Sequence, residues 1–370
     1  MNKNLTEQAT TLAASEDYHA LERLLSKNKG FDILNAHVSP KFCEWGPTPL
    51  YYITIKSVAK KMKDPCRMMR FLVSHGANPN LAANDGSTPL WSQTTNDGSL
   101  KLMQTLLELG ANPNQISMEG KKKWTPLFHC LLSSPDESDD DILLSFQKAE
   151  LLLKYGADPD QIYDSGKSEW TPLIEFLRPS FDKIDYKNHY PPDELSIEKA
   201  KFLLENGANP NLVCPALPLF PPLNIAIEYG FSQKNGETAI LELIELMLQR
   251  GAYPNETLNS GQSLLAFAIE KGLYLVGELL LAYGAKKPEK TEYVYWHLTP
   301  EGRQRWNEML EKYEKTQREK IVTDQTLAFF QSEEFEQIIN ATKNVGDKRD
   351  EKRTPAGISE KALAVLKKDC

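Results

Sequence analysis

The residues of this sequence with the chemistry for catalysis or metal binding are five cysteines, six histidines and a run of three aspartates. None of the cysteines belongs to a C-x-x-C pair, the local spacing typical of zinc ligands. Their wide spacing and odd number favour reduced, structural cysteines in a reducing compartment. We therefore expect no metal centre. The cysteines are Cys43, Cys66, Cys130, Cys214 and Cys370.

A nucleophile paired with a base is not evident either. His129 and Cys130 are sequence neighbours, and adjacent residues on a helix do not face each other. The aspartates at 139–141 lack the glycine and the alternating ligands of a calcium loop. The sequence has no phosphate-binding, zinc-protease, nucleophile-elbow or dinucleotide motif. We expect no catalytic residue and no cofactor; an enzyme with an unrecognised site in residues 286–370 or in inserted loops stays the alternative.

Composition is that of a globular protein, with 370 residues, 41% hydrophobic and 25% charged. The formal net charge of −8 argues against nucleic acid as the main partner, because phosphate binding needs a basic surface. No apolar run approaches the roughly 18 residues of a membrane-spanning helix. Residues 1–15 contain one lysine and no long apolar core, unlike a secretory signal. We expect a cytoplasmic protein without membrane insertion.

Two short peptides recur along the chain and indicate internal repeats. The first is Gly-Ala-Asn-Pro-Asn and its variants, which begin at Gly76, Gly110, Gly156, Gly207 and Gly251. The second is Thr-Pro-Leu, which begins at Thr48, Thr88, Thr125 and Thr171 and degrades to Pro221–Leu223 and Ser263–Leu265. Thr before Pro predicts a helix start, because the hydroxyl caps free N–H groups and Pro suits the first turn. Glycine after an apolar stripe predicts a helix end, so each unit should be a helix pair followed by an extended turn.

These peptides resemble the ankyrin repeat, a unit of about 33 residues whose first helix begins Thr-Pro-Leu-His-x-Ala. The resemblance covers about residues 5–285. It implies an all-α solenoid of six to seven helix-turn-helix units with extended turn fingers in residues 1–285, the first and last units being atypical. The family's usual histidine is replaced by Tyr51, Trp91, Phe128, Ile174, Asn224 and Ala266.

The same resemblance implies a protein-binding surface on the concave face. Two positions per unit recur there in the family: the residue before the helix start and the second residue after its leucine. Adjacent units contribute Trp124 and Trp170, which either contact a partner or pack on the next finger. Lys121–Lys123 make one fingertip basic, which serves an acidic partner or solubility. The full set of candidate partner-binding residues is Trp124, Trp170, Tyr52, Trp91, His129, Glu175, Phe220, Ile225 and Phe267.

Units in the middle of the array are longer than the family length. The fingers that follow Gly110, Gly156 and Gly207 are two or three residues longer than those at the ends. Insertions also separate the two helices of a unit at 133–141, 178–193 and 229–237. The acidic insertion at 133–141 is expected to be solvated. The aromatic insertion at 178–193 either folds back over the array or presents a contact.

Beyond residue 285 the repeat stops. Trp306, Met309, Leu310 and Tyr313 form an amphipathic stripe, which predicts a helix starting at Thr299. A second helix is predicted over 323–341. We assign 286–342 to a helical cap for the open end of the array, and 343–370 to a charged linker with a short tail helix at 359–368.

The function expected from this sequence is binding of another protein, without catalysis. Ankyrin arrays with irregular insertions, Lys/Asn-rich composition and a polar tail resemble effectors of intracellular bacteria. That resemblance implies a eukaryotic host protein as the partner, and export into the host cytosol.

Overall fold

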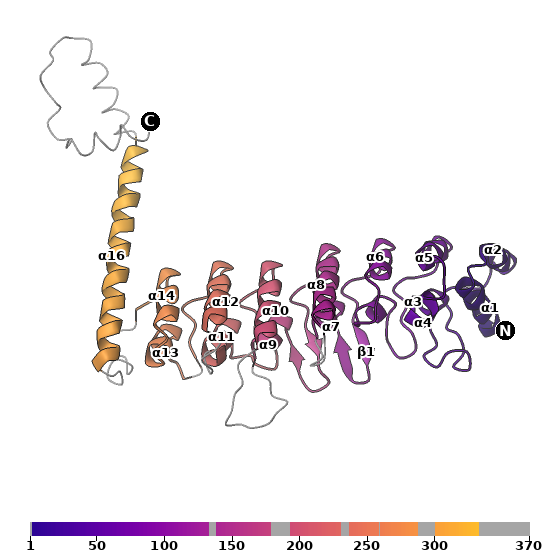
Figure 1. The fold of residues 1–370 in the computed structure, drawn as a ribbon, viewed down its shortest axis with the longest axis horizontal. Coiled ribbons are helices and arrows are strands. Elements are labelled where there is room, and N and C mark those ends of the chain that lie inside the picture. The colour runs from indigo at the N-terminus through magenta and orange to yellow at the C-terminus, as the bar shows by residue number, and fades with distance from the viewer. Residues whose placement is uncertain are drawn as a thin grey trace, which may run out of the picture. The chain divides into compact units, whose positions relative to one another are not determined.

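The computed structural model describes residues 2–132, 138–178, 193–230, 237–258, 260–287 and 300–332. The chain forms two compact units with a boundary between Arg303 and Gln304. The first unit contains a row of helix pairs (Figure 1). The described part of the second unit continues the long helix α16 (Pro300–Phe330), which begins just before the boundary.

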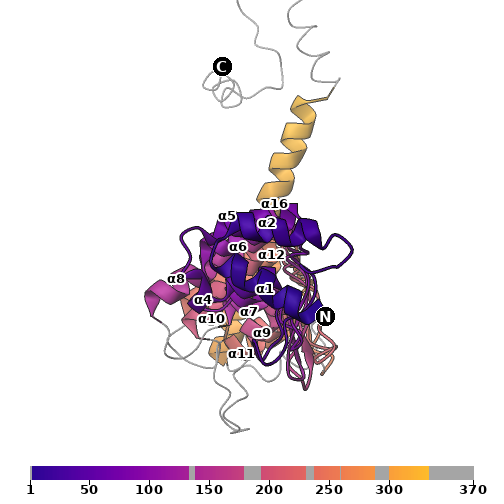
Figure 2. The same cartoon turned by 90° about the vertical axis from the view of Figure 1, so that its right-hand side faces the viewer.

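The row begins with the pair α1 (Asn2–Ala14) and α2 (Tyr18–Lys27). Figure 2 views this pair from its end of the row, with later pairs behind it. The first helices of the following units are α3 (Pro49–Thr54), the 3₁₀ turn η1 (Trp91–Gln93), α7 (Pro126–Leu131), α9 (Pro172–Leu177), α11 (Pro222–Gly230) and α13 (Leu264–Glu270). The second helices are α5 (Pro65–Ser74), α6 (Leu100–Glu108), α8 (Asp139–Lys154), α10 (Glu194–Glu205), α12 (Glu237–Gln249) and α14 (Tyr274–Ala282); a further short helix, α4 (Lys56–Ala59), follows α3.

The recurring peptides form the helix ends that their composition predicts. The Thr125 hydroxyl accepts a hydrogen bond of 3.2 Å from the Phe128 amide, and Pro126 occupies the first turn of α7. Gly110 has φ +89°, and the Ala111 amide bonds the Leu106 carbonyl at 2.9 Å, so the chain leaves α6 through a left-handed residue. The leucine of every Thr-Pro-Leu motif or its variant is at most 2% exposed. These are Leu50, Leu90, Leu127, Leu173, Leu223 and Leu265.

An asparagine ladder joins consecutive fingers. The Asn80 side chain donates to the Gly110 carbonyl at 2.9 Å and accepts from the Asn112 amide at 2.6 Å. Asn35, Asn114, Asn211 and Asn255 repeat the same pair of bonds to the next unit. Each asparagine thus fixes the start of the next finger with one donor and one acceptor.

The fingers also contain strands, so the fold is mostly helical and not purely so. Strands β1 (Ser117–Glu119) and β2 (Lys122–Trp124) form one hairpin, and β3 (Tyr163–Asp164) and β4 (Glu169–Trp170) form the next. Pairing of Lys123 with Asp164 joins them into an antiparallel sheet ordered β1-β2-β3-β4. These two fingers are among the lengthened ones, and the extra residues close the hairpins.

Two expectations about local structure need correction. Asp139 and Asp140 are exposed to solvent as expected, but the three aspartates form the first turn of α8 and not a loop, and Ser138 and Asp141 make a reciprocal capping box there. Carboxylates at a helix N-terminus are stabilised by the free amides there. Helix α16 runs through Thr323 without a break, so the two C-terminal helices expected there are one as far as Phe330. The 133–137, 179–192 and 231–236 insertion segments and residues 333–370 lie outside the described residues.

Candidate functional site

Trp124 is a packing residue of its finger. It ends β2, is 7% exposed, and donates from Nε1 to the Glu119 carboxylate at 2.8 Å. Its ring stacks on Tyr163 with centroids 5.6 Å apart, and the Lys122 ammonium lies 5.3 Å from the ring centroid. The two alternatives for Trp124 are contact with a partner and packing on the next finger, and its surroundings match the second.

Trp170 lies in a different environment. It is half-buried at the end of β4, and the Arg178 guanidinium lies 4.7 Å from its ring centroid. Arg178 also pairs with the Glu175 carboxylate, which accepts a hydrogen bond from the Tyr163 hydroxyl as well. Burial and the adjacent carboxylate raise the pKa of Tyr163, which therefore remains a donor. Glu175 thus holds Arg178 in place over Trp170.

His129 and Cys130 are held in enclosed positions of α7. The His129 ring lies 4.8 Å from that of Trp91, and its Nδ1 lies 2.6 Å from the Thr94 hydroxyl. Burial lowers the pKa of His129 to about 4, so the imidazole is neutral near pH 7. Burial raises the pKa of the Cys130 thiol to about 12, which leaves almost no thiolate.

The other candidate residues lie along the first helices. Tyr52 in α3 is half-buried and packs near Phe42, with centroids 5.4 Å apart. Phe220 and Phe267 are also half-buried. Ile225 is 0% exposed, so its expected place on a contact surface is corrected: α11 is covered around this position, and Ile225 belongs to the core.

The structure adds a row of exposed apolar residues that motif reasoning missed. Ile116, Ile162 and Val213 are each more than a third exposed. Each stands six positions after the turn glycine of its unit, and equivalent positions of a repeat array form a line. We call these three residues the finger row. Their common distance from the glycine was the sequence signal that could have identified them.

A polar interruption of the array creates a pocket in the third unit. The first helix of this unit is only the 3₁₀ turn η1, and a loop follows it in place of further apolar turns. Gln93 fills the gap: its Nε2 donates to the Thr54 carbonyl at 3.0 Å, and its Oε1 accepts from the Ser99 amide at 3.1 Å. Lys148 of α8 donates to the Thr95 carbonyl at 2.6 Å, which ties the loop to the fourth unit.

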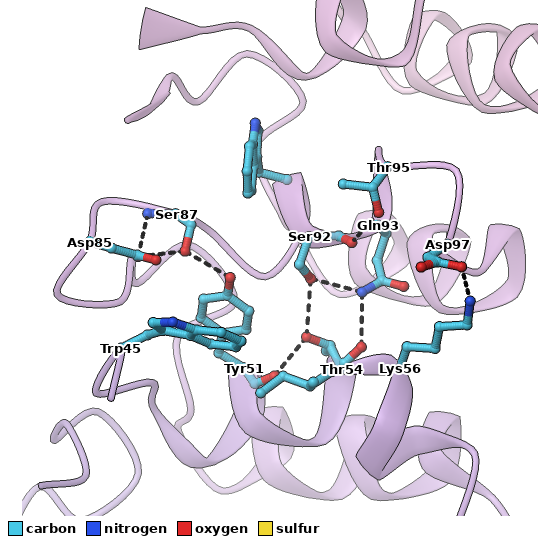
Figure 3. A pocket seen from close by; sticks show the side chains of 13 residues that line it. Trp45, Tyr51, Thr54, Lys56, Asp85, Ser87, Ser92, Gln93, Thr95 and Asp97 are labelled. Atoms are coloured by element: carbon cyan, nitrogen blue, oxygen red, sulfur yellow. Dashed lines mark hydrogen bonds and ion pairs between the residues drawn. The ribbon is translucent and has the colours of Figure 1, made fainter. Parts of the chain in front are cut away.

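The pocket, of about 240 Å³, opens between α3 and η1 (Figure 3). Three aromatic residues line it: Trp45, whose side chain is 48% exposed, and Tyr51 and Trp91. The Tyr51 hydroxyl lies 2.7 Å from that of Ser87, which donates to the Asp85 carboxylate at 2.6 Å. Burial raises the pKa of Tyr51 to about 12, so this hydroxyl keeps its proton.

Charge in the pocket is unequally compensated. Figure 3 shows Lys56 and Asp97 paired on the side of the pocket opposite Asp85. Asp85 accepts hydrogen bonds from the amide and hydroxyl of Ser87. Within the described ranges, no lysine or arginine makes an ion pair with Asp85.

Comparison with solved structures finds a likeness to an ankyrin repeat domain from Acinetobacter baumannii. The two have 18% sequence identity and a TM-score of 0.34, and the match covers 75% of this chain and 98% of that one. No protein-family model matches the chain, and no curated protein matches it.

The described residues also limit the chemistry of the site. They contain no cluster of three His, Cys, Asp or Glu side chains able to hold a metal ion. No helix among them is both long and apolar enough to cross a bilayer. The side chains around the pocket are aromatic rings, hydroxyls and ionic groups.

Proposed function

We propose that this chain is an ankyrin-type repeat array that binds a partner protein, without catalysis, through its fingers and first helices. The observation that carries the proposal is the finger row of Ile116, Ile162 and Val213, exposed at equivalent positions of consecutive units. Half-buried Trp170, together with Tyr52, Trp91, His129, Glu175, Phe220 and Phe267, adds to this surface. Aligned apolar side chains favour binding because covering them removes apolar area from water.

Preorganisation of the fingers supports this function. The asparagine ladder and the four-stranded sheet fix successive fingers relative to one another before any partner arrives. A surface that is already ordered loses little conformational entropy on binding. The array therefore presents a rigid template for recognition.

The setting we propose is that of a bacterial effector acting on a eukaryotic host protein in the host cytosol. Its support is the sequence: irregular insertions between repeated units, and a polar segment after them. The finger row supplies a contact surface, and its chemistry suits any partner with an apolar patch.

An affinity capture with matched variants tests the proposal. The finger variant is Ile116→Ser with Ile162→Ser. The control is Leu143→Ser with Leu275→Ser, which removes two exposed leucines from the second helices α8 and α14. Both variants should keep the wild-type circular dichroism and thermal midpoint, because exposed side chains contribute little to stability.

Each chain is immobilised and exposed to eukaryotic and to bacterial lysates. We expect a protein retained from the eukaryotic lysate by wild type and control and lost by the finger variant. Retention by all three chains alike would refute the finger surface as the binding site. Specific retention from the bacterial lysate alone would refute the host setting while keeping the binding function.

A further inference from the structure

The pocket between α3 and η1 has a chemistry of its own. We propose that it binds a cationic side chain, arginine or lysine, carried by a peptide segment of the partner protein. This inference rests on the proposed function and specifies what the partner brings to it. Of the partner-binding residues transferred from the ankyrin pattern, only Trp91 lines it, because the pocket arises where the first helix is shortened to η1.

The aromatic walls supply the first argument. Trp45 and Tyr51 of the second unit and Trp91 of the third line one space of about 240 Å³. Cations bind to the faces of aromatic rings, and tryptophan provides the strongest such contact. Trp45 leaves about half of its side chain in water, so a ligand that covers it also removes apolar area from solvent.

Charge decides the sign of the ligand. The pocket is lined by Asp85, Asp97 and Lys56, and the lysine is paired with Asp97. Asp85 remains as a carboxylate whose described partners are only the amide and hydroxyl of Ser87. An anionic ligand would approach this uncompensated carboxylate, whereas an arginine or lysine would neutralise it. The chain as a whole carries −8, which also attracts a basic segment.

Trp91 allows ligand binding to be separated from stability. Its Nε1–H is buried and has no hydrogen-bond partner in the described structure. A buried donor without an acceptor costs free energy, and phenylalanine at this position would carry no such donor. Phenylalanine at this position would remove the unpaired donor, but its ring would attract a cation less strongly than the indole does. Stability and ligand binding should respond in opposite directions when Trp91 is replaced.

The test is a titration of the full chain, labelled with ¹⁵N at the tryptophan indoles, followed by NMR. The probes are acetyl-Gly-Arg-Gly-amide, its lysine counterpart, and acetyl-Gly-citrulline-Gly-amide as the neutral analogue of arginine. We expect saturable shifts of the Trp45 and Trp91 indole signals with a cationic probe, and about tenfold weaker binding of citrulline. The tighter of the two cationic probes identifies the group that the pocket prefers.

Three variants separate binding from folding. Asp85→Asn keeps an oxygen for the two Ser87 donors and should weaken the cationic probe about tenfold. Asp139→Asn, at the exposed start of α8, is the matched control and should leave binding unchanged. Trp91→Phe should keep or raise the thermal midpoint and weaken the probe several-fold.

Equal affinity for arginine and citrulline peptides, or no saturable shift at tens of millimolar probe, would overturn the proposal. So would unchanged binding in both Asp85→Asn and Trp91→Phe. The titration contains no partner protein, and the lysate capture depends on the finger row. If the pocket fails to bind the cationic peptides while the lysate capture succeeds, this inference alone is refuted. If the pocket binds them while the capture fails, the proposed finger surface alone is refuted.

Discussion

Asp160 is the exception in the asparagine ladder and provides a sharp test of how the fingers are held. Asn114 and Asn211, in the units before and after it, each donate to the next turn-glycine carbonyl and accept from a backbone amide. Asp160 only accepts, from the Asn209 amide at 2.9 and 3.1 Å. An ionised carboxylate has no proton to donate to the Gly207 carbonyl. We therefore predict that Asp160→Asn stabilises the array.

The magnitude combines the added donor with the net effect of removing the charge. The amide adds one hydrogen bond, a net gain of about 1 kcal/mol, and loses the charge that strengthens the bond from Asn209. Burial raises the pKa of Asp160, and this effect exceeds the lowering caused by Asn209, so the fold disfavours the charged form. Both the added donor and the removed charge then act in the same direction, and we expect a gain of roughly 1–2 kcal/mol at pH 7.

Urea unfolding followed by circular dichroism measures this gain, with an unchanged denaturant slope as the criterion for comparing free energies. Because the folded-state pKa of Asp160 is raised, its contribution to stability is complete below the usual pKa of 3.8 and is lost as pH rises through the folded value. The advantage of the variant should therefore be larger at pH 7 than at low pH. Asn114→Asp is the reciprocal control and should lose roughly 1–2 kcal/mol at pH 7. A neutral or destabilising Asp160→Asn, or a silent Asn114→Asp, would refute the role given to the ladder.

Three further predictions follow from the environments of single residues. Trp124→Ala should lower the free energy of unfolding, measured in urea, by about 3–5 kcal/mol, whereas Trp170→Ala should lower it by about 1 kcal/mol. The reason is that the Trp124 ring is enclosed and the Trp170 ring is half-exposed. Equal losses would contradict these assignments. The free energy of unfolding should fall as pH drops from 6.5 towards 4, because the pKa of His129 is lowered to about 4 in the fold and the unfolded chain takes up this proton first. His129→Gln should flatten this part of the stability–pH profile. An unaltered profile would exclude His129 as the source of the fall. Gly98→Ala should lower the free energy of unfolding by roughly 1–3 kcal/mol, because the added methyl meets the Gln93 carbonyl; a neutral result would show that the loop after η1 adapts freely.

Sequence reasoning was most successful where a local rule repeats. A hydroxyl before proline and a glycine after an apolar stripe specify the ends of a helix within a few residues, and the leucine after the proline is buried in each unit. It was less successful for Ile225, which motif alignment placed on the surface. Alignment gives the direction of a side chain from its own helix, but burial also depends on what the neighbouring units and insertions cover.

By itself, the sequence determined where helices of the repeated units begin and end, because helix caps and turns depend on neighbouring residues in the chain. Only the tertiary structure decided that Trp124 packs while Trp45 stays exposed, since both are tryptophans near a helix start and differ in what the adjacent finger provides. It also decided the joining of two hairpins into one sheet and the meeting of Trp45, Tyr51 and Trp91 around a pocket. These features bring together residues of different units, whose separation in the sequence carries no rule for their contact.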